Sequence, residues 1–494
     1  MLRNLYNTTI FEGFGKTGEN SFPNGLAFLS GKFHANYSKE FIKSNYFDDW
    51  DLIWKRFANL SYLTWFAEDE AWLNMFLYQK KGFKQQPTDH RLRPFMVACA
   101  NDPDVCRTKS MLCVSHRALH NVQLQYLRQF LTKYEPSHPK FALFWNVAIA
   151  HDKPWKLSLL DSDLSEFLVN NYHLLKDAFL FIMGDHGNRI SLIRRTVVGS
   201  FEDSMPFFSM AVPASLRQQH PELSQVLQRN SKLLASFHDL YVTFRDIIEC
   251  QQRGEWPDFS YQRDWTHTGT DFPASQSLLR PLTANRSCAD IGIEDAHCFC
   301  EQFLPLFLND SRVPAISEAL IEHMNDALSA HLDCVRLALN RTLHIQQKAH
   351  EQNASAEHFH DKDVYRVTVE AVPSGGLFQA QLRYNGSDYI VMGSISRINK
   401  YGNQSDCIDD EILRKYCFCV PPQMQVPVST SGPDVIKTGA VSHDQILPAS
   451  QPSSHGARNE EQQLLDSVPP FGPYPTDYKT EQERLVAPPA MNAI

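Results

Sequence analysis

The sequence lacks any long uninterrupted apolar segment. Its longest nearly continuous apolar run, from Phe141 to Ala150, is far shorter than the roughly 20 residues that cross a bilayer as a helix. An excess of positive charge is also missing, because 47 Lys and Arg stand against 56 Asp and Glu in 494 residues, for a formal net charge of −9. The first absence argues against a transmembrane helix, and the second argues against a nucleic-acid partner.

The N-terminus lacks the basic region and apolar core of a signal peptide. The chain nevertheless contains nine N-x-S/T sequons, at Asn7, Asn36, Asn59, Asn285, Asn309, Asn340, Asn353, Asn385 and Asn403. Sequons together with 11 cysteines are typical of the secretory pathway. We therefore predict a secreted or lumenal glycoprotein whose targeting segment is missing from this chain. The alternative is a cytosolic protein with chance sequons and free thiols.

The cysteines favour disulfide bonds over a zinc site. Cys298 and Cys300 form a Cys-x-Cys pair, which differs from the Cys-x-x-Cys spacing of zinc ligands. With Cys288 they are interpreted as part of a disulfide framework. The odd number of cysteines leaves at least one thiol unpaired or intermolecular.

Residues 1–270 alternate apolar runs with helical periodicities. Four runs are continuously apolar, as in strands buried on both faces of a parallel sheet: Tyr62–Phe66, Phe141–Ala148, Ala178–Met183 and Phe207–Val212. Helical stretches are expected at Leu112–Lys133, Leu159–Leu175 and Ser215–Cys250. This alternation predicts a layered α/β domain.

The remaining residues follow two other patterns. In 271–420, a cysteine-bearing loop precedes an expected helix at Pro314–Gln352 and two strand-like runs, Asp363–Val372 and Leu377–Ile390, joined by a Pro-Ser-Gly-Gly turn. This pattern predicts a smaller α+β unit. Residues 421–494 are rich in Pro, Ser, Thr and Gln, which predicts a disordered tail.

The best candidate site is the Gly-Asp-His-Gly segment at 184–187, directly after an apolar run. Ligands of open α/β sheets collect at the carboxyl ends of strands. The Asp185 carboxylate next to the His186 imidazole is suited to binding a metal there. A turn that uses Asp and Gly for conformational reasons alone has the same sequence.

A second candidate is Ser21, which precedes Pro23 at the start of an expected helix. The N–H groups and dipole of a helix N-terminus stabilise an anion, and a hydroxyl there can act as a nucleophile. The alternative is that Ser21 caps the helix and Pro23 occupies its first turn.

Glu68 and Asp69 follow an apolar run and are a third acidic pair. They could be metal ligands, but we interpret them as the solvated start of a helix.

Together, the Ser21 and Asp185 segments resemble those of the alkaline phosphatase and sulfatase superfamily. Further ordered blocks resemble one branch, the animal sulfatase-like family of unknown function: 65–69, 89–95, 145–152, 184–189, 202–206, 287–300 and 396–402. The resemblance covers residues 10 to 420. It implies an alkaline-phosphatase-like α/β fold, a divalent metal ion (Ca, Mn or Zn) held by Asp185, His186 and Ser21, and Ser21 as nucleophile.

The resemblance also implies a role for His151 and a missing element. His151 resembles the histidine that contacts the substrate or leaving group and could act as general acid; the alternative is a structural histidine in a loop. Arg189, two residues beyond Gly187, could pair with a substrate anion, and the alternative is a surface arginine. The superfamily carries another acidic metal ligand after its first strand, upstream of the nucleophile. Residues 1–20 contain no Asp, and neither Glu12 nor Glu19 follows an apolar strand. We therefore expect an N-terminally truncated member.

The leading function is hydrolysis or transfer of a phosphate- or sulfate-type ester, with a small-molecule, glycan-linked or lipid-linked substrate. Sulfatases of this superfamily make formylglycine from a Cys in a context with a downstream Arg, whereas this chain has Ser21 and Asn24. This departure favours phosphoesters. The alternative is a catalytically inactive, truncated glycoprotein that serves as a binding module.

Overall fold

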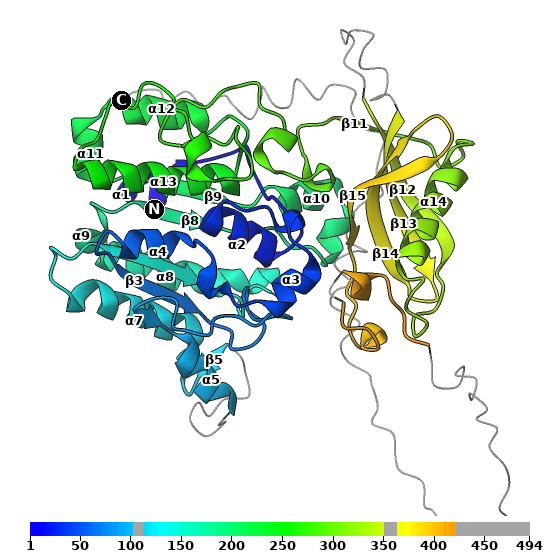
Figure 1. Cartoon of the computed structure of the whole chain (residues 1–494), viewed down its shortest axis with the longest axis horizontal. Helices are drawn as coiled ribbons and strands as arrows, with labels where there is room; N and C mark the ends of the chain where they lie inside the picture. Colours follow the sequence, from blue (N-terminus) through cyan, green and yellow to red (C-terminus); the bar gives the residue numbers. More distant parts are fainter. Residues whose placement is uncertain (102–111, 152, 350–362, 411, 421–494) are drawn as a thin grey trace, which may run out of the picture. The chain divides into compact units, whose positions relative to one another are not determined.

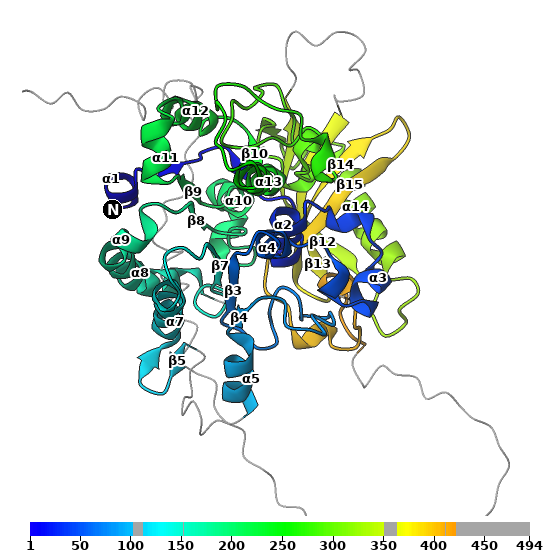
Figure 2. The same cartoon turned by 60° about the vertical axis from the view of Figure 1, so that its left-hand side comes forward.

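Two three-stranded sheets lie in the middle of the N-terminal part of this computed structural model (Figures 1 and 2). The model describes residues 1–101, 112–151, 153–349, 363–410 and 412–420. One sheet has the order β4 (His90–Arg91), β3 (Leu63–Glu68), β7 (Lys140–Trp145), and all its pairs are parallel. The other has the order β1 (Thr9–Ile10), β9 (Phe208–Ala211), β8 (Leu180–Met183), and all its pairs are antiparallel. The four predicted strands exist, but the prediction that all of them are parallel is wrong for β8 and β9.

Helices surround these sheets, so the predicted α/β class is confirmed. They are α1 (Leu2–Tyr6), α2 (Ser21–Ser30), α3 (Lys39–Ser44), α4 (Ile53–Ala58), α5 (Arg93–Asn101), α7 (Leu119–Lys133), α8 (Ser158–Asn170), α9 (Tyr172–Leu175), α10 (Val197–Ser204), α11 (Ala214–Gln219), α12 (Glu222–Asn230) and α13 (Phe237–Arg253). Four short strands complete this part: β2 (Phe14–Gly15), β5 (Cys113–Val114), β6 (Arg117–Ala118) and β10 (Ala235–Ser236). None of the described helices combines the length and apolarity needed to cross a membrane.

The largest hydrophobic core lies where α2, α4 and α13 meet the sheets. Leu26 of α2, Trp54 of α4 and Leu240 of α13 are fully buried there. α13 begins with a capping box between Ser236 and Asp239, which satisfies backbone N–H groups that have no partner inside the helix. In place of the single helix expected at Ser215–Cys250, the structure has three helices, α11, α12 and α13. β10 lies immediately before α13.

The C-terminal part of the described chain contains a five-stranded antiparallel sheet, β11 to β15 in sequence order. Its elements are β11 (Phe303–Pro305), α14 (Val313–Ala327), β12 (Ala338–Lys348), β13 (Val364–Val372), β14 (Gly376–Tyr384) and β15 (Tyr389–Arg397). α14 packs against β12, β13 and β15. Together they form a second hydrophobic core, separate from the largest one. The predicted turn between the last two apolar runs is confirmed by the β13–β14 pairing.

The prediction of one helix across Pro314–Gln352 is wrong. α14 ends at Ala327, and Ala338–Lys348 is a strand that pairs with β13 over nearly its whole length. Pairing with a neighbouring strand outweighs local helix propensity here. The end of the predicted helix, from residue 350, and the predicted tail at 421–494 lie outside the described residues.

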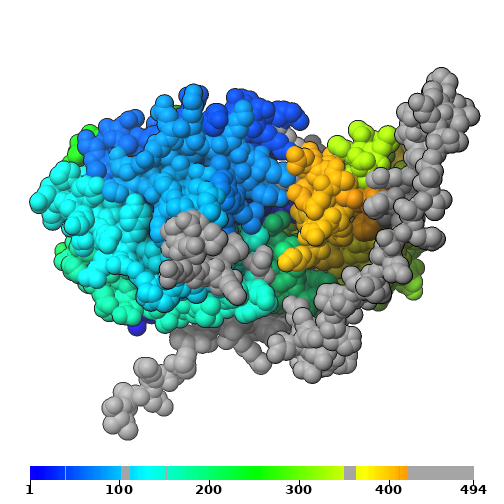
Figure 3. Space-filling model, turned by 90° about the horizontal axis from the view of Figure 1, so that it is seen from below, coloured from blue at the N-terminus to red at the C-terminus, as the bar shows by residue number. Residues whose placement is uncertain are grey.

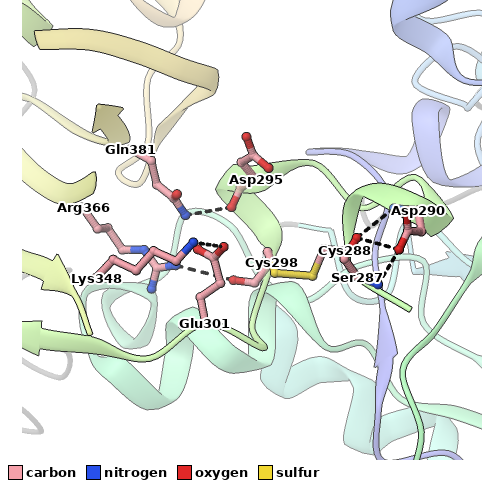
Figure 4. The surroundings of a disulfide bond; sticks show 9 residues. All are labelled: Ser287, Cys288, Asp290, Asp295, Cys298, Glu301, Lys348, Arg366 and Gln381. Atoms are coloured by element: carbon pink, nitrogen blue, oxygen red, sulfur yellow. Dashed lines mark hydrogen bonds and ion pairs between the residues drawn. A yellow bond between two sulfur atoms is a disulfide. The ribbon is translucent and has the colours of Figure 1, made fainter. Parts of the chain in front are cut away.

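Disulfides join the loops of the C-terminal part, as the cysteine pattern predicted, but the prediction is wrong for Cys300, which is not part of the framework. They link Cys288 to Cys298, Cys334 to Cys417 and Cys407 to Cys419, whereas Cys113, Cys250 and Cys300 are free thiols. Figure 4 shows how the five-stranded sheet holds the first of these loops: Gln381 donates to the Asp295 carbonyl oxygen (2.7 Å), Arg366 donates to that of Cys298 (3.5 Å), and Lys348 pairs with Glu301 (2.8 Å).

Candidate functional site

Ser21 is the first residue of α2, at the end of a loop that enters the core. The Asn20 side chain caps this helix by accepting from the Phe22 N–H (3.3 Å). The buried Asn24 side chain stabilises the loop before it, accepting from the Thr17 and Gly18 amides at 2.8 and 2.9 Å. Asn24 thus fixes the approach to Ser21. The sequence showed Asn24 only as a departure from the sulfatase motif, not as the residue that fixes the loop.

Asp185 and His186 follow β8 directly, as the sequence predicted. Glycine is required at position 187, because an added Cβ would lie 2.0 Å from the Glu202 carbonyl oxygen. The Gly187 amide instead donates to the Asp203 carbonyl oxygen at 3.1 Å. The turn after β8 is therefore packed against the end of α10.

Ser21, Asp185 and His186 come together although 164 residues separate the first two along the chain. The Ser21 Oγ lies 3.5 Å from His186 Nε2, and an Asp185 carboxylate oxygen lies 3.5 Å from the same nitrogen. That oxygen is buried and has no hydrogen-bond partner. Three polar atoms from the two predicted motifs thus face one another.

The protonation of His186 follows from its surroundings. Its Nδ1 lies 2.7 Å from the Gly187 carbonyl oxygen, which can only accept, so Nδ1 carries a proton. Burial lowers the pKa of His186 and outweighs the opposing effect of Asp185, so the ring is neutral near pH 7. Nε2 therefore presents a lone pair to the Asp185 carboxylate and to Ser21. Two lone pairs in contact repel each other unless a cation lies near both.

Two groups of buried charges hold the loops around these atoms. Lys16 and Arg194 both pair with Asp203, at 2.7 and 2.9 Å, and all three side chains are almost fully buried. The Lys16 pair connects the loop before α2 with α10. Sequence reasoning missed this network, because its partners are separated by up to 187 residues and carry no local spacing signal.

The second group includes Arg189, which we expected to bind a substrate anion. Arg189 lies 3.6 Å from Glu19, and Lys415 pairs with the same carboxylate. These two cations keep the pKa of Glu19 below its usual range despite burial. The charge of Arg189 is thus partly balanced within the protein, and its binding of a substrate anion stays a prediction.

His151 follows β7 and is exposed. Its amide donates to the Val147 carbonyl oxygen at 3.0 Å, so the backbone here forms a turn. Its contact with a substrate or leaving group stays a prediction.

Replacing Asp203 with Asn is expected to destabilise the protein by about 3–5 kcal/mol, because Lys16 and Arg194 would remain buried with insufficient negative charge. Urea unfolding measures this change. Asp51→Asn is the matched control, since Asp51 pairs with Arg56 at the surface and should cost less than about 1 kcal/mol. A loss for Asp203→Asn no larger than that of the control would contradict the proposed role of the network.

The interpretation of Glu68 and Asp69 as a solvated helix start is wrong. Both side chains are buried at the end of β3. Glu68 accepts from the Met75 amide (2.9 Å), and Asp69 accepts from that of Val147 (2.6 Å). Burial raises the pKa of Glu68 to about 8 and that of Asp69 to about 6, and Asp185 adds to the shift of Glu68. The end of β3 therefore holds two buried carboxyl groups with raised pKa values.

The Glu68 shift predicts a specific pH dependence. Because the folded protein holds this proton up to about pH 8 while the unfolded chain releases it near its ordinary pKa of 4.5, the free energy of unfolding falls as pH rises between these values. Glu68→Gln should remove this loss, which amounts to a few kcal/mol at about 1.4 kcal/mol per pKa unit. We expect the variant to melt above the wild type at pH 8 and close to it near pH 4.5. Equal melting curves at pH 8 would disprove the shift, and Glu40→Gln, at an exposed position of α3, serves as the control.

Comparison with known protein families places this chain in one of them. Residues 2–343, more than half of the chain, match the family described as "Protein of unknown function (DUF229)". The chain belongs to the DUF229 family. This confirms the branch of unknown function that the motifs indicated. None of the curated proteins compared with this DUF229 chain matches it.

Several solved structures resemble the DUF229 chain at low identity. The C-terminal periplasmic domain of the phosphoethanolamine transferase EptC from Campylobacter jejuni is 13% identical with a TM-score of 0.35, over 57% of this chain and 85% of that chain. The corresponding Escherichia coli EptC domain in complex with Zn is 13% identical with a TM-score of 0.34, over 57% and 78%. A Bacteroides thetaiotaomicron protein from a glycosaminoglycan-metabolism locus is 9% identical with a TM-score of 0.34, over 79% and 80%. Likeness at this level does not define an activity.

Proposed function

We propose that this DUF229 protein is a metal-dependent hydrolase or transferase of the alkaline phosphatase and sulfatase superfamily that acts on phosphate-type esters. One observation carries the proposal: the Ser21 hydroxyl and a buried, unpartnered Asp185 oxygen each lie 3.5 Å from His186 Nε2. This combination unites a nucleophile with two ligand atoms. Sulfate esters are the other substrate class that the motifs indicate.

The three side chains fit a divalent cation. A carboxylate oxygen, an imidazole nitrogen and a hydroxyl oxygen suit Ca, Mn or Zn to different degrees. Separations of 3.5 Å are close to those between neighbouring ligands of one ion at bond lengths near 2.1 Å. A bound ion would lower the pKa of the Ser21 hydroxyl and offset phosphate charge.

The protein's own residues perform the remaining tasks. The Nδ1–H bond to the Gly187 carbonyl fixes the His186 ring with Nε2 toward Ser21. The caps of α2 hold the Ser21 hydroxyl at the N-terminus of that helix, where the dipole favours the negative charge that develops during attack. We propose that His151 acts as general acid for the leaving group and that Arg189 binds a substrate anion.

The sequons support a secretory or extracellular location. Eight of the nine lie in described residues, and the asparagine of each of these is exposed: Asn7, Asn36, Asn59, Asn285, Asn309, Asn340, Asn385 and Asn403. The disulfides that link Cys288 to Cys298, Cys334 to Cys417 and Cys407 to Cys419 also suit an oxidising compartment. We propose that the protein is a glycoprotein that acts on a small-molecule, glycan-linked or lipid-linked ester.

A second candidate function is a non-catalytic binding module. Among the described residues, Asp185 and His186 have no third Asp, Glu, His or Cys whose ligand atom lies within 4.8 Å of both of theirs. A catalytic ion usually has three or more protein ligands, and here the third would be the Ser21 hydroxyl, which is also the proposed nucleophile. This observation favours the binding module if the site receives no further ligand.

Turnover of model esters distinguishes the two functions. The protein is stripped with EDTA, reloaded with Ca, Mn or Zn, and assayed with p-nitrophenyl phosphate, bis(p-nitrophenyl) phosphate and p-nitrophenyl sulfate. The proposed enzyme cleaves a phosphoester with at least one ion and loses this activity in EDTA. Cleavage of the sulfate alone would overturn the preference for phosphate, and no turnover with any ion would favour the binding module.

A further inference from the structure

Cys288, Cys298 and Cys300 form a cluster of three sulfur atoms. Cys288 and Cys298 are joined by a disulfide, and the Sγ of the free Cys300 lies within 4.8 Å of both of their sulfurs. The two bonded cysteines are buried, whereas Cys300 is exposed to solvent. A thiolate attacks a neighbouring disulfide directly, without any other reagent. The cluster therefore contains both reactants of a thiol–disulfide exchange.

The loop that this disulfide closes contacts the C-terminal sheet on one side. It accepts hydrogen bonds there from Gln381, Arg366 and Ser394. Figure 4 shows the disulfide with strands of this sheet on one side and N-terminal residues, in blue, on the other. The two parts also lie side by side on the surface in Figure 3, where C-terminal residues in orange adjoin N-terminal residues in blue. The loop thus lies where the two parts meet.

On its other side, this region contacts the segment that leads to Ser21. Gly15 is the last residue of β2, and a Cβ added to it would lie 2.6 Å from Ile293 Cδ1 and 2.6 Å from Phe299 Cε1. Both side chains are therefore packed directly against the Gly15 backbone. The next residue, Lys16, belongs to the buried ion-pair network with Asp203. A displacement of Phe299 would therefore change the support of the loop before Ser21.

We propose that Cys288, Cys298 and Cys300 form a thiol–disulfide exchange site, in which Cys300 replaces Cys298 as the partner of Cys288 and thereby shifts the loop that leads to Ser21. The exchange moves the cross-link by two residues along the chain. Phe299, which contacts Gly15, then lies inside the closed loop. This inference is independent of the proposed activity, because its readouts are sulfur connectivity and amide exchange.

The exchange step consumes no oxidant and no reductant. The Cys300 thiol loses its proton to water, and the thiolate forms a bond to Cys288 Sγ. The bond between Cys288 and Cys298 breaks, its electron pair stays on Cys298 Sγ, and this sulfur takes up a proton from water. A bond between Cys298 and Cys300 would instead close a ring across one residue, and loops this short are stiff. Attack on Cys288 is therefore the favoured direction.

Thiol labelling of the full chain tests the exchange. The protein is incubated near pH 8.5, unfolded in urea below pH 7, where exchange is slow, and labelled with N-ethylmaleimide before peptide mapping by mass spectrometry. We expect label on both Cys298 and Cys300, and we expect Cys300→Ser to lose the label on Cys298. Cys250, a buried free thiol, should be labelled in every sample and serves as the internal control. Label on Cys300 without Cys298 would overturn the proposal, and so would a pattern that changes with protein concentration, because exchange would then occur between molecules.

The pH dependence of the labelling identifies the attacking group. Burial and the adjacent Glu301 raise the pKa of the Cys300 thiol. Glu301 itself pairs with Lys348, and Arg366 is the other charged residue beside it in Figure 4. Because the thiolate fraction rises about tenfold per pH unit below the pKa, label should appear on Cys298 about tenfold faster at pH 8 than at pH 7. A rate that does not rise with pH would overturn attack by Cys300.

Two variants hold the site in its two forms. Cys300→Ser retains the bond between Cys288 and Cys298, whereas Cys298→Ser, refolded in a glutathione buffer, should contain a bond between Cys288 and Cys300. Amides of residues 14–19 should exchange with solvent at rates that differ at least about tenfold between the variants, while those of α7 should not differ. A missing bond in Cys298→Ser, or equal exchange in the two variants, would overturn the proposal. The labelling of the wild type does not depend on how well either variant folds.

Discussion

Ser21→Ala is expected to reduce kcat/KM for a phosphoester that the wild type cleaves by at least about 10³-fold, which corresponds to roughly 4 kcal/mol of transition-state stabilisation. The substitution removes the hydroxyl that faces His186 Nε2 at 3.5 Å, and with it the nucleophile. The fold should persist, because the cap of α2 is provided by Asn20 and not by Ser21. Steady-state kinetics and circular dichroism measure the two effects separately.

The matched control for this substitution is Ser38→Ala. Ser38 also lies at the start of a helix, where its hydroxyl accepts from the Phe41 amide at 3.1 Å and caps α3. Its loss should cost about 1 kcal/mol of stability and leave turnover unchanged. Activity retained in Ser21→Ala would place the nucleophile elsewhere, and this result would refute the proposed mechanism while leaving the metal site open to its own test.

Asp185→Ala and His186→Ala are each expected to remove bound divalent metal from the purified protein. Each substitution deletes one of the two ligand atoms that lie 3.5 Å apart. In the wild type, an ion at 100 times its dissociation constant should add about 2.7 kcal/mol to the free energy of unfolding. Neither variant should show this gain. Elemental analysis and melting curves with and without Ca, Mn or Zn provide the measurements.

Asp163→Ala is the control for the metal site. Asp163 also forms an Asp–His pair, at 2.7 Å from His120 Nε2, but this pair lies between α7 and α8 and includes no serine. We expect its metal content to equal that of the wild type. If Asp185→Ala and His186→Ala both kept wild-type metal content, the site assignment would be false. Metal loss without any loss of turnover would separate metal binding from the proposed reaction.

The local sequence determined which segments carry the candidate chemistry. Asp185 and His186 could be recognised because an apolar strand ends directly before them, and strand ends are where polar side chains of an α/β sheet gather. Ser21 could be recognised because Pro23 marks the first turn of a helix. The Cys-x-Cys spacing indicated a disulfide framework that includes Cys288, whereas only the structure shows that Cys288 pairs with Cys298 and that Cys300 is free.

Local sequence could not determine how distant segments pair. The prediction of a helix through residue 352 is wrong because hydrogen bonds to β13 stabilise β12 as a strand. β13 is distant in the sequence, so local helix propensity does not include this effect. Glu68 and Asp69 are adjacent acidic residues, and acidic residues are usually exposed to solvent, yet the folded protein buries both. Their protonation depends on neighbours that are distant in the chain.

The sequence by itself determined the α/β class, the two motifs and the branch of unknown function, because these depend on periodicity and on short ordered blocks. Only the tertiary structure decided that Ser21 faces His186 and that Asp203 neutralises Lys16 and Arg194. The physical reason is that hydrogen bonds, ion pairs and strand pairing act over a few ångströms in space. Their partners here are separated by many tens of residues, so only the folded chain brings them within reach.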